Sequence, residues 1–214
     1  ANDEFGYIGK ADPNTHEVRY QKIDLSTLVA VGDPISLPNE MLSTTAQAAA
    51  TYGSSAAIYG NTLYTPVYVT PAADPQTATI INLVNSSVSS FQIVPDAQLS
   101  LTSTLMYGTA TKVYIVANKT LVVIDPQTQA VIKSIPLADI GAGADGPLGI
   151  VVDSNDQNAY IATNSKKILT VNLDTDQVSA LNASGTLSNP ITNIDLTSNG
   201  DYLYIYDQAA KTYI

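Results

Sequence analysis

Short apolar strands separated by polar turns recur along the whole chain. The best-defined example is a strand built around a tyrosine with apolar neighbours, and it occurs five times, at Tyr7, Tyr68, Tyr114, Tyr160 and Tyr204. The intervals between these tyrosines are 61, 46, 46 and 44 residues. No segment carries a sustained helical period, so the pattern favours β-structure. A nearly constant long interval indicates tandem copies of one supersecondary unit.

The residues around each tyrosine strand predict four strands per copy. An apolar strand and a turn rich in Asp, Asn, Ser or Gly precede the tyrosine strand, for example at 149–158 and 194–201. A third strand, a second polar turn and a fourth strand follow it, at 121–135 and 168–181. Asn, Asp and Gly tolerate left-handed backbone, and Pro presets φ, so both connections are predicted to be tight turns.

Four short antiparallel strands every 44 to 46 residues are typical of propeller blades. We therefore expect an all-β fold, a β-propeller of four-stranded antiparallel blades, either a partial propeller or an irregular five-bladed ring. A single propeller repeat region spans residues 1–214 in this interpretation. Its units are predicted at 1–37, 50–95, 98–136, 147–182 and 191–214.

The strand count does not fit a simple closed ring. The pattern begins at a second strand near Tyr7 and stops at 213–214, inside a third strand, which gives five second strands but four first strands. Three interpretations stay open: a part of a longer protein, an irregular five-bladed ring, or an open arc that pairs with another copy through exposed strand edges.

The repeat resembles a known family. The strand 147–152, the turn 153–158 and the strand 160–164 look like the YVTN family of β-propeller repeats, and so do residues 122–128 with 135–137. The similarity is good over residues 111–207 and looser over 1–110. It implies a tandem propeller, often secreted or at a cell surface, in a family that also includes relatives of lactonases and of cofactor-dependent enzymes.

The amino-acid composition limits the classes of partner and the cellular compartments that we expect. The chain of 214 residues carries 13% charged residues and a formal net charge of −10, from 9 Lys plus Arg against 19 Asp plus Glu. Phosphate recognition needs a basic footprint, so we expect no nucleic-acid partner. No apolar stretch is long enough for a membrane span. The low charge and the absence of cysteine favour an extracellular, periplasmic or cell-surface protein.

The sequence offers few residues for a catalytic or metal-binding site. The one histidine, His16, stands in a predicted loop without a nucleophile beside it, and thiolate sites are excluded because the chain has no cysteine. The glycine-rich stretch 141–146 leads into a strand, whereas a phosphate loop leads into a helix. Residues 153–158 begin like a calcium loop, but Asn164 occupies the position of its final glutamate. We expect no cofactor.

Three groups of residues are the candidates for binding or modification. Asp139 and Asp145 flank the glycine-rich connection, which is expected on one face of a propeller. Tyr52, Tyr59 and Tyr64 depart from the simple repeat and are candidates for a ligand-binding face. The Asn-X-Ser/Thr sequons at Asn85, Asn118 and Asn182 are candidate glycosylation sites.

Two functions of different classes follow. The favoured hypothesis is a secreted or cell-surface propeller that binds a protein or glycan, or assembles with further copies of itself, without catalysis. The alternative is a fragment of a lactonase-like or cofactor-dependent propeller enzyme. One histidine and an incomplete set of blades supply at most a part of such an active site.

Overall fold

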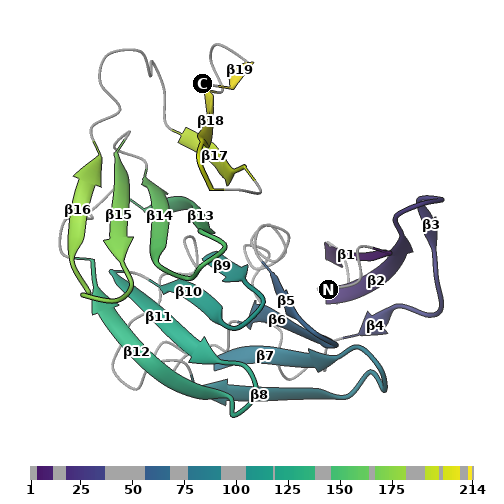
Figure 1. Cartoon of the computed structure of the whole chain (residues 1–214). Helices are drawn as coiled ribbons and strands as arrows, with labels where there is room; N and C mark the ends of the chain where they lie inside the picture. The colour runs from purple at the N-terminus through teal and green to yellow at the C-terminus, as the bar shows by residue number, and fades with distance from the viewer. Residues whose placement is uncertain are drawn as a thin grey trace. The chain divides into compact units, whose positions relative to one another are not determined.

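The structure of the chain is a computed structural model. It describes residues 4–11, 18–36, 56–67, 77–92, 105–117, 119–137, 146–163, 167–181, 191–197, 200–207 and 212–213. The chain divides into two compact units, Ala1–Leu101 and Thr102–Ile214. Over the described residues every regular element is a β-strand, and the strands form separate antiparallel sheets (Figure 1).

The described residues of the first unit form two four-stranded sheets. Sheet A consists of β1 (Phe5–Ala11), β2 (Val18–Asp24) and β3 (Val29–Ala30), with β4 (Ile35–Ser36) also paired to β2. Sheet B consists of β5 (Ala57–Tyr59), β6 (Thr62–Val67), β7 (Thr77–Asn82) and β8 (Val88–Gln92) in sequence order. A hydrogen bond between the hydroxyls of Tyr20 and Thr65, both buried, joins the two sheets.

In the second unit, the part of the chain that the structure describes forms two four-stranded sheets and one three-stranded sheet. Sheet C consists of β9 (Leu105–Gly108), β10 (Val113–Ala117), β11 (Thr120–Asp125) and β12 (Ala130–Pro136). Sheet D consists of β13 (Pro147–Val152), β14 (Asn158–Thr163), β15 (Ile168–Asn172) and β16 (Val178–Leu181). Sheet E consists of β17 (Ile191–Leu196), β18 (Leu203–Asp207) and β19 (Thr212–Tyr213).

The predicted all-β fold class is confirmed. Sheets B, C and D each run from first to fourth strand as an antiparallel meander, which is the order of strands in a propeller blade. Sheet A begins at a second strand and sheet E carries a first, a second and a third strand, as the sequence pattern predicts. These sheets are consistent with propeller blades, and closure into a ring stays a prediction.

One turn geometry between the third and fourth strands recurs in four sheets. An Asp or Asn side chain at the end of the third strand accepts hydrogen bonds from backbone N–H groups two and three residues later, at Asp24, Asn82, Asp125 and Asn172. The residue four positions after each has positive φ, and these residues are Leu28, Ser86, Gln129 and Asp176. Non-glycine residues rarely adopt this conformation, so its recurrence identifies the sheets as copies of one unit.

The registers correct the repeat alignment in one place. Thr62 of β6 lies opposite Asn82, just as Asn158 lies opposite Asn172, so the repeating tyrosine of sheet B is Tyr64. The sequence pattern assigned that position to Tyr68, which lies outside the described residues. The turn between β5 and β6, at Gly60, is shorter than the equivalent turns of the other sheets. Because of that shorter turn, the spacing of residues in the sequence does not reveal the strand register of sheet B.

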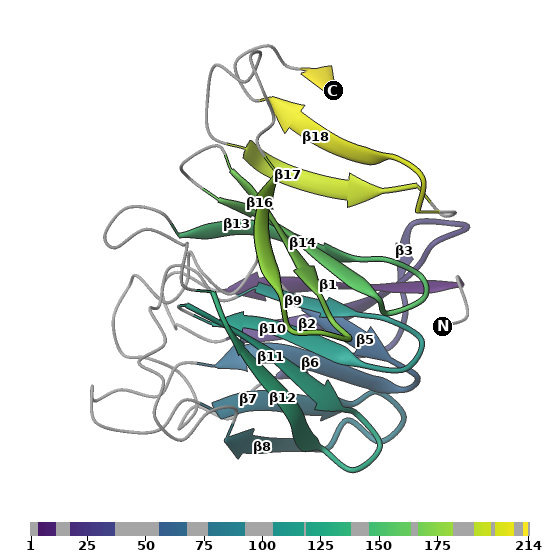
Figure 2. The ribbon, with the colours of Figure 1, turned by 60° about the vertical axis from the view of Figure 1, so that its left-hand side comes forward.

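Sheets C, D and E pack on one another through defined faces. We call the face that carries Tyr114, Tyr160 or Tyr204 the tyrosine face of its sheet. The tyrosine face of sheet C packs against the opposite face of sheet D, and the shared core holds Tyr114, Val116, Ile150, Val152, Ile161 and Leu169. The tyrosine face of sheet D packs in the same way against sheet E, through Val151, Ala162, Ile168, Ile194 and Ile205. Strand β13 accordingly contacts both β9 and β17 (Figure 2).

Candidate functional site

Three equivalent turns lie at the ends of the first strands of sheets C, D and E. Their first residues are Thr109, Asp153 and Thr197, and consecutive members are 44 residues apart. In each turn the backbone N–H of this residue donates to the carbonyl at the far end, on Lys112, Asn158 and Tyr202 respectively. The side chain of the same residue then accepts a hydrogen bond from the backbone on that far side. Each turn is therefore closed by two hydrogen bonds, one from the backbone and one to a side chain.

The closing side chains differ only in the kind of oxygen that they supply. Thr109 Oγ1 lies 3.1 Å from the N–H nitrogen of Lys112, and Thr197 Oγ1 lies 3.1 Å from that of Tyr202. Asp153 accepts with both oxygens, because Oδ1 lies 2.8 Å from the nitrogen of Gln157 and Oδ2 lies 2.9 Å from that of Asn158. Both oxygens of this carboxylate are thus engaged in turn structure.

The three turns line an open pocket of about 250 Å³. Its lining consists of Tyr107, Gly108, Thr109, Ala110, Val152, Asp153, Ser154, Leu196 and Thr197. Apolar side chains come from the strand ends, and the hydroxyl and carboxylate groups come from the turns. Ligand pockets typically measure about 300–1,000 Å³, so this one lies just below that range.

Tyr107 is the aromatic wall of the pocket. Burial raises the pKa of its phenol, and the negative charge of Asp195 raises it further. The phenol therefore stays protonated at neutral pH and keeps its hydrogen-bond donor. The protonated phenol and the Ser154 hydroxyl can donate to and accept from a polar, uncharged group, whereas the hydroxyls of Thr109 and Thr197 already bond within their turns.

A polar cluster at the turns, of which only Tyr114 is fully buried, links sheet C to sheet D. The Thr111 hydroxyl donates to Asp156 Oδ2 across the two sheets. Tyr114 is fully buried, and burial, followed by the charge of Asp156, raises the pKa of its phenol. Within the described part of the chain, neither Tyr114 Oη nor Asp156 Oδ1 has a partner in hydrogen-bonding geometry.

Asp156 occupies a strained backbone position. Its φ is 56°, and the equivalent residue of the next turn is Gly200, with a φ of 75°. Both residues donate the same hydrogen bond, to the carbonyl three residues earlier. An aspartate tolerates positive φ less well than glycine does, and here its carboxylate accepts the hydrogen bond from Thr111 across the sheets.

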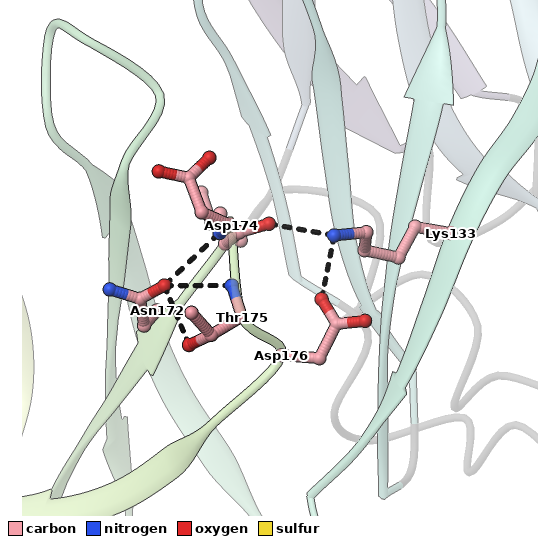
Figure 3. A network of polar contacts seen from close by, with 6 residues as sticks. Lys133, Asn172, Asp174, Thr175 and Asp176 are labelled. Carbon is pink, nitrogen blue, oxygen red and sulfur yellow. Dashed lines mark hydrogen bonds and ion pairs between the residues drawn. The ribbon is translucent and has the colours of Figure 1, made fainter.

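A second contact joins sheets C and D at their outer edge (Figure 3). Lys133 of β12 donates to the carbonyl of Leu173 at 2.7 Å and forms an ion pair with Asp176 at 2.6 Å. The turn that receives it is fixed by Asn172, whose Oδ1 accepts from the nitrogens of Asp174 and Thr175. Sheets C and D are therefore joined at two places, by the bond from Thr111 to Asp156 at their turns and by the contacts of Lys133 at their outer edge. These contacts set the orientation of the two sheets that carry most of the pocket.

The structure places some of the residues that the sequence pattern selected. Tyr59 ends β5 and is partly buried, and Tyr64 is fully buried in sheet B. Asn85 lies exposed in the turn between β7 and β8, where its Oδ1 accepts from the nitrogen of Ser87. His16, Tyr52, Asn118, Asp139, Asp145 and Asn182 lie outside the described residues. The binding and glycosylation roles of all these residues stay predictions.

The residues of the pocket were missed as a group from the sequence. A signal for them exists, because a side chain able to close a turn recurs at an interval of 44 residues just before each tyrosine strand. Their convergence depends on the packing of sheets C, D and E, which the spacing alone does not reveal. Among the described residues there is no group of three or more His, Cys, Asp and Glu that is arranged for a metal ion. No helix in the described ranges is long and apolar enough to cross a membrane.

Comparisons with known proteins add no family assignment. No family model matches the chain, and a search of the curated proteins finds no match. The repeated four-stranded sheets therefore carry the assignment of fold, and the resemblance to YVTN repeats rests on the sequence alone.

Proposed function

We propose that this chain is a β-propeller repeat module related to the YVTN repeats, and that it binds a protein or glycan partner without catalysing a reaction. The low share of charged residues, 13%, and the absence of cysteine support a place outside the cytoplasm, secreted or at a cell surface. Assembly with further copies belongs to the same proposal.

The pocket at the three turns is the observation that carries this proposal. It is small, it is lined by hydroxyl groups and one half-buried tyrosine, and doubly closed turns hold its rim. Groups that are already hydrogen-bonded within the rim have less conformational entropy to lose when a ligand binds, which favours recognition. An aromatic wall with hydroxyl groups around it suits one ring of a glycan, or one polar side chain of a protein.

The engagement of Asp153 argues for binding rather than catalysis. Asp153 is the one carboxylate among the described residues that line the pocket, and both of its oxygens already accept backbone hydrogen bonds. A general base needs a lone pair directed at the reacting proton. Here the carboxylate is a structural acceptor of the turn, as the threonine hydroxyls are in the two equivalent turns.

The test uses the full chain and a variant that fills the pocket. Ser154 is exposed and lines the pocket, so Ser154→Tyr closes it without disturbing the core. Ser179→Tyr, at an exposed position of β16 in the same sheet, is the matched control. Saturation-transfer NMR against a panel of neutral monosaccharides and oligosaccharides, with purified extracellular proteins screened in parallel, measures binding.

We expect the wild-type chain and Ser179→Tyr to bind the same ligand saturably, and Ser154→Tyr to lose at least tenfold in affinity. If all three chains bind the ligand equally well, the pocket is not the binding site. Hydrolysis of a lactone by the wild-type chain that Ser154→Tyr abolishes would contradict the proposal in favour of an enzyme.

A further inference from the structure

The tyrosine face of sheet E differs from the equivalent faces of sheets C and D. On the first strand the position opposite the repeating tyrosine is Tyr107 in sheet C, Val151 in sheet D and Asp195 in sheet E. Val151 is 3% exposed beneath sheet E, whereas Asp195 is exposed. Burying the charge of Asp195 would be costly even though its Oδ1 accepts from the Leu196 nitrogen, so this face is poorly suited to another apolar sheet.

Tyrosines follow one another along the same face of β18. Tyr204 and Tyr206 share one face of β18, because residues at intervals of two lie on the same face of a strand, and Tyr202 immediately precedes the strand. Tyr202 is 68% exposed and Tyr204 is 44% exposed. The equivalent residues of sheet D are Asn158, Tyr160 and Ala162, so sheet E has gained an aromatic ring at both flanking positions.

Negative charge accompanies these rings. Asp195 lies directly across the strand pair from Tyr204, and Asp201 lies exposed in the turn that leads into β18. The described residues of sheet E include no lysine or arginine. A cation over a tyrosine ring is attracted by the electrons of the ring, and a neighbouring carboxylate adds a direct charge interaction.

We propose that the face of sheet E formed by Tyr202, Tyr204, Tyr206 and Asp195 binds a basic segment of a partner protein, with arginine or lysine side chains stacked on the tyrosines and paired with Asp195. This inference rests on the proposed function, of which it names one partner class. The charge on the face decides the class, because neutral glycans gain nothing from Asp195 beyond a hydrogen bond, whereas a basic side chain neutralises it. Stacking on adjacent rings also favours an extended segment with cations at alternate residues.

The test uses the full chain and a fluorescein-labelled peptide of alternating glycine and arginine. A peptide of alternating glycine and glutamine with the same length is the uncharged control. Fluorescence anisotropy measures affinity at about 0.1 M and 1 M salt, between which the Debye length falls from roughly 10 Å to 3 Å. Asp195→Asn removes the charge with little change of shape, Tyr204→Ser removes the ring, and Tyr204→Phe retains it. Asp174→Asn, at an exposed acidic position in the turn of sheet D, is the matched charge control.

We expect saturable binding of the arginine peptide that weakens at high salt. Asp195→Asn and Tyr204→Ser should each weaken it about two- to fivefold, while Tyr204→Phe and Asp174→Asn bind as the wild type does. Equal losses in Asp174→Asn and Asp195→Asn would overturn the inference, since general acidity would then account for binding. Competition by a neutral oligosaccharide that is lost in Tyr204→Ser would overturn it in favour of a glycan. If the peptide fails to bind while Ser154→Tyr still abolishes glycan or protein binding, this inference fails and the proposed function stands.

Discussion

Replacement of Gly149 by alanine tests the packing of sheet D on sheet E. A Cβ atom at this position would lie 2.7 Å from Ile194 Cγ2 and 3.5 Å from the Ile194 nitrogen. Carbon atoms in favourable contact are about 3.5–4.0 Å apart, so the methyl group must displace Ile194 by nearly an ångström. Ile194 is 4% exposed and has little room to move.

The expected cost follows from that overlap. Overpacking of a core costs about 1–3 kcal/mol, and replacing glycine in a strand regains roughly 0.5–1 kcal/mol. Gly149→Ala should therefore lower the free energy of unfolding by about 1–2 kcal/mol. Urea denaturation followed by circular dichroism measures this change.

A control and a rescue make the test specific. A Cβ at Gly6 would approach Leu25 Cδ2 at 3.1 Å, but Leu25 is 47% exposed and can turn aside, so Gly6→Ala should leave stability unchanged or raise it slightly. Ile194→Leu moves the branching methyl away from Gly149 and should recover part of the loss in the double variant. If Gly149→Ala and Gly6→Ala behave alike, the close approach of the two sheets is refuted.

Three further predictions concern the turns and the edge contact. Asn172→Ala removes the acceptor of its turn and should lower the free energy of unfolding, measured by urea denaturation, by about 1 kcal/mol. Asn172→Asp introduces the residue type found at Asp24 and Asp125 and should retain most of the stability. Equal losses in the two variants would contradict the role of the side chain. Lys133→Met should lower the free energy of unfolding by less than about 1 kcal/mol, because Lys133 and Asp176 are both partly exposed. The loss should shrink as salt is added, since salt screens the ion pair. A loss that does not depend on salt would assign the effect to packing. Hydrogen bonds from Gln127 and Thr128 lower the pKa of Asp125, so its contribution is present above the ordinary aspartate value of 3.8 and is lost as pH falls through the lower pKa of the folded state. Asp125→Asn should therefore show a flatter decline of stability with acid than the wild type, and parallel declines would count against the turn bond.

The sequence is sufficient to predict the sheets because each strand type has a local signal. Alternation around Tyr114 and Tyr160 and the polar turns after them predict the antiparallel pairing that the registers show. In the turn of sheet D the acceptor is Asn172, at the end of its strand, and not the acidic Asp174 two residues later. Both residues lie within a polar run, and the period of the strand alone does not decide between them.

The pocket and the contacts between sheets depend on distances that local patterns do not encode. The bond from Thr111 to Asp156 joins residues 45 positions apart, and nothing in either turn predicts the other. Tyr64 shows the same difficulty, because a shortened connection moves the repeating tyrosine four residues from its expected place at Tyr68. Hydrogen bonding within one turn can therefore be predicted from the sequence, whereas contacts between turns of different sheets are known only once the sheets are packed.

The central claim is that the three equivalent turns of sheets C, D and E form one binding site. Titration of the ¹⁵N-labelled full chain with the ligand found in the binding screen tests it most directly. We predict that the amide signals of Thr109, Asp153 and Thr197 shift together and yield one dissociation constant. Shifts confined to one turn, or three turns with different dissociation constants, would contradict the claim.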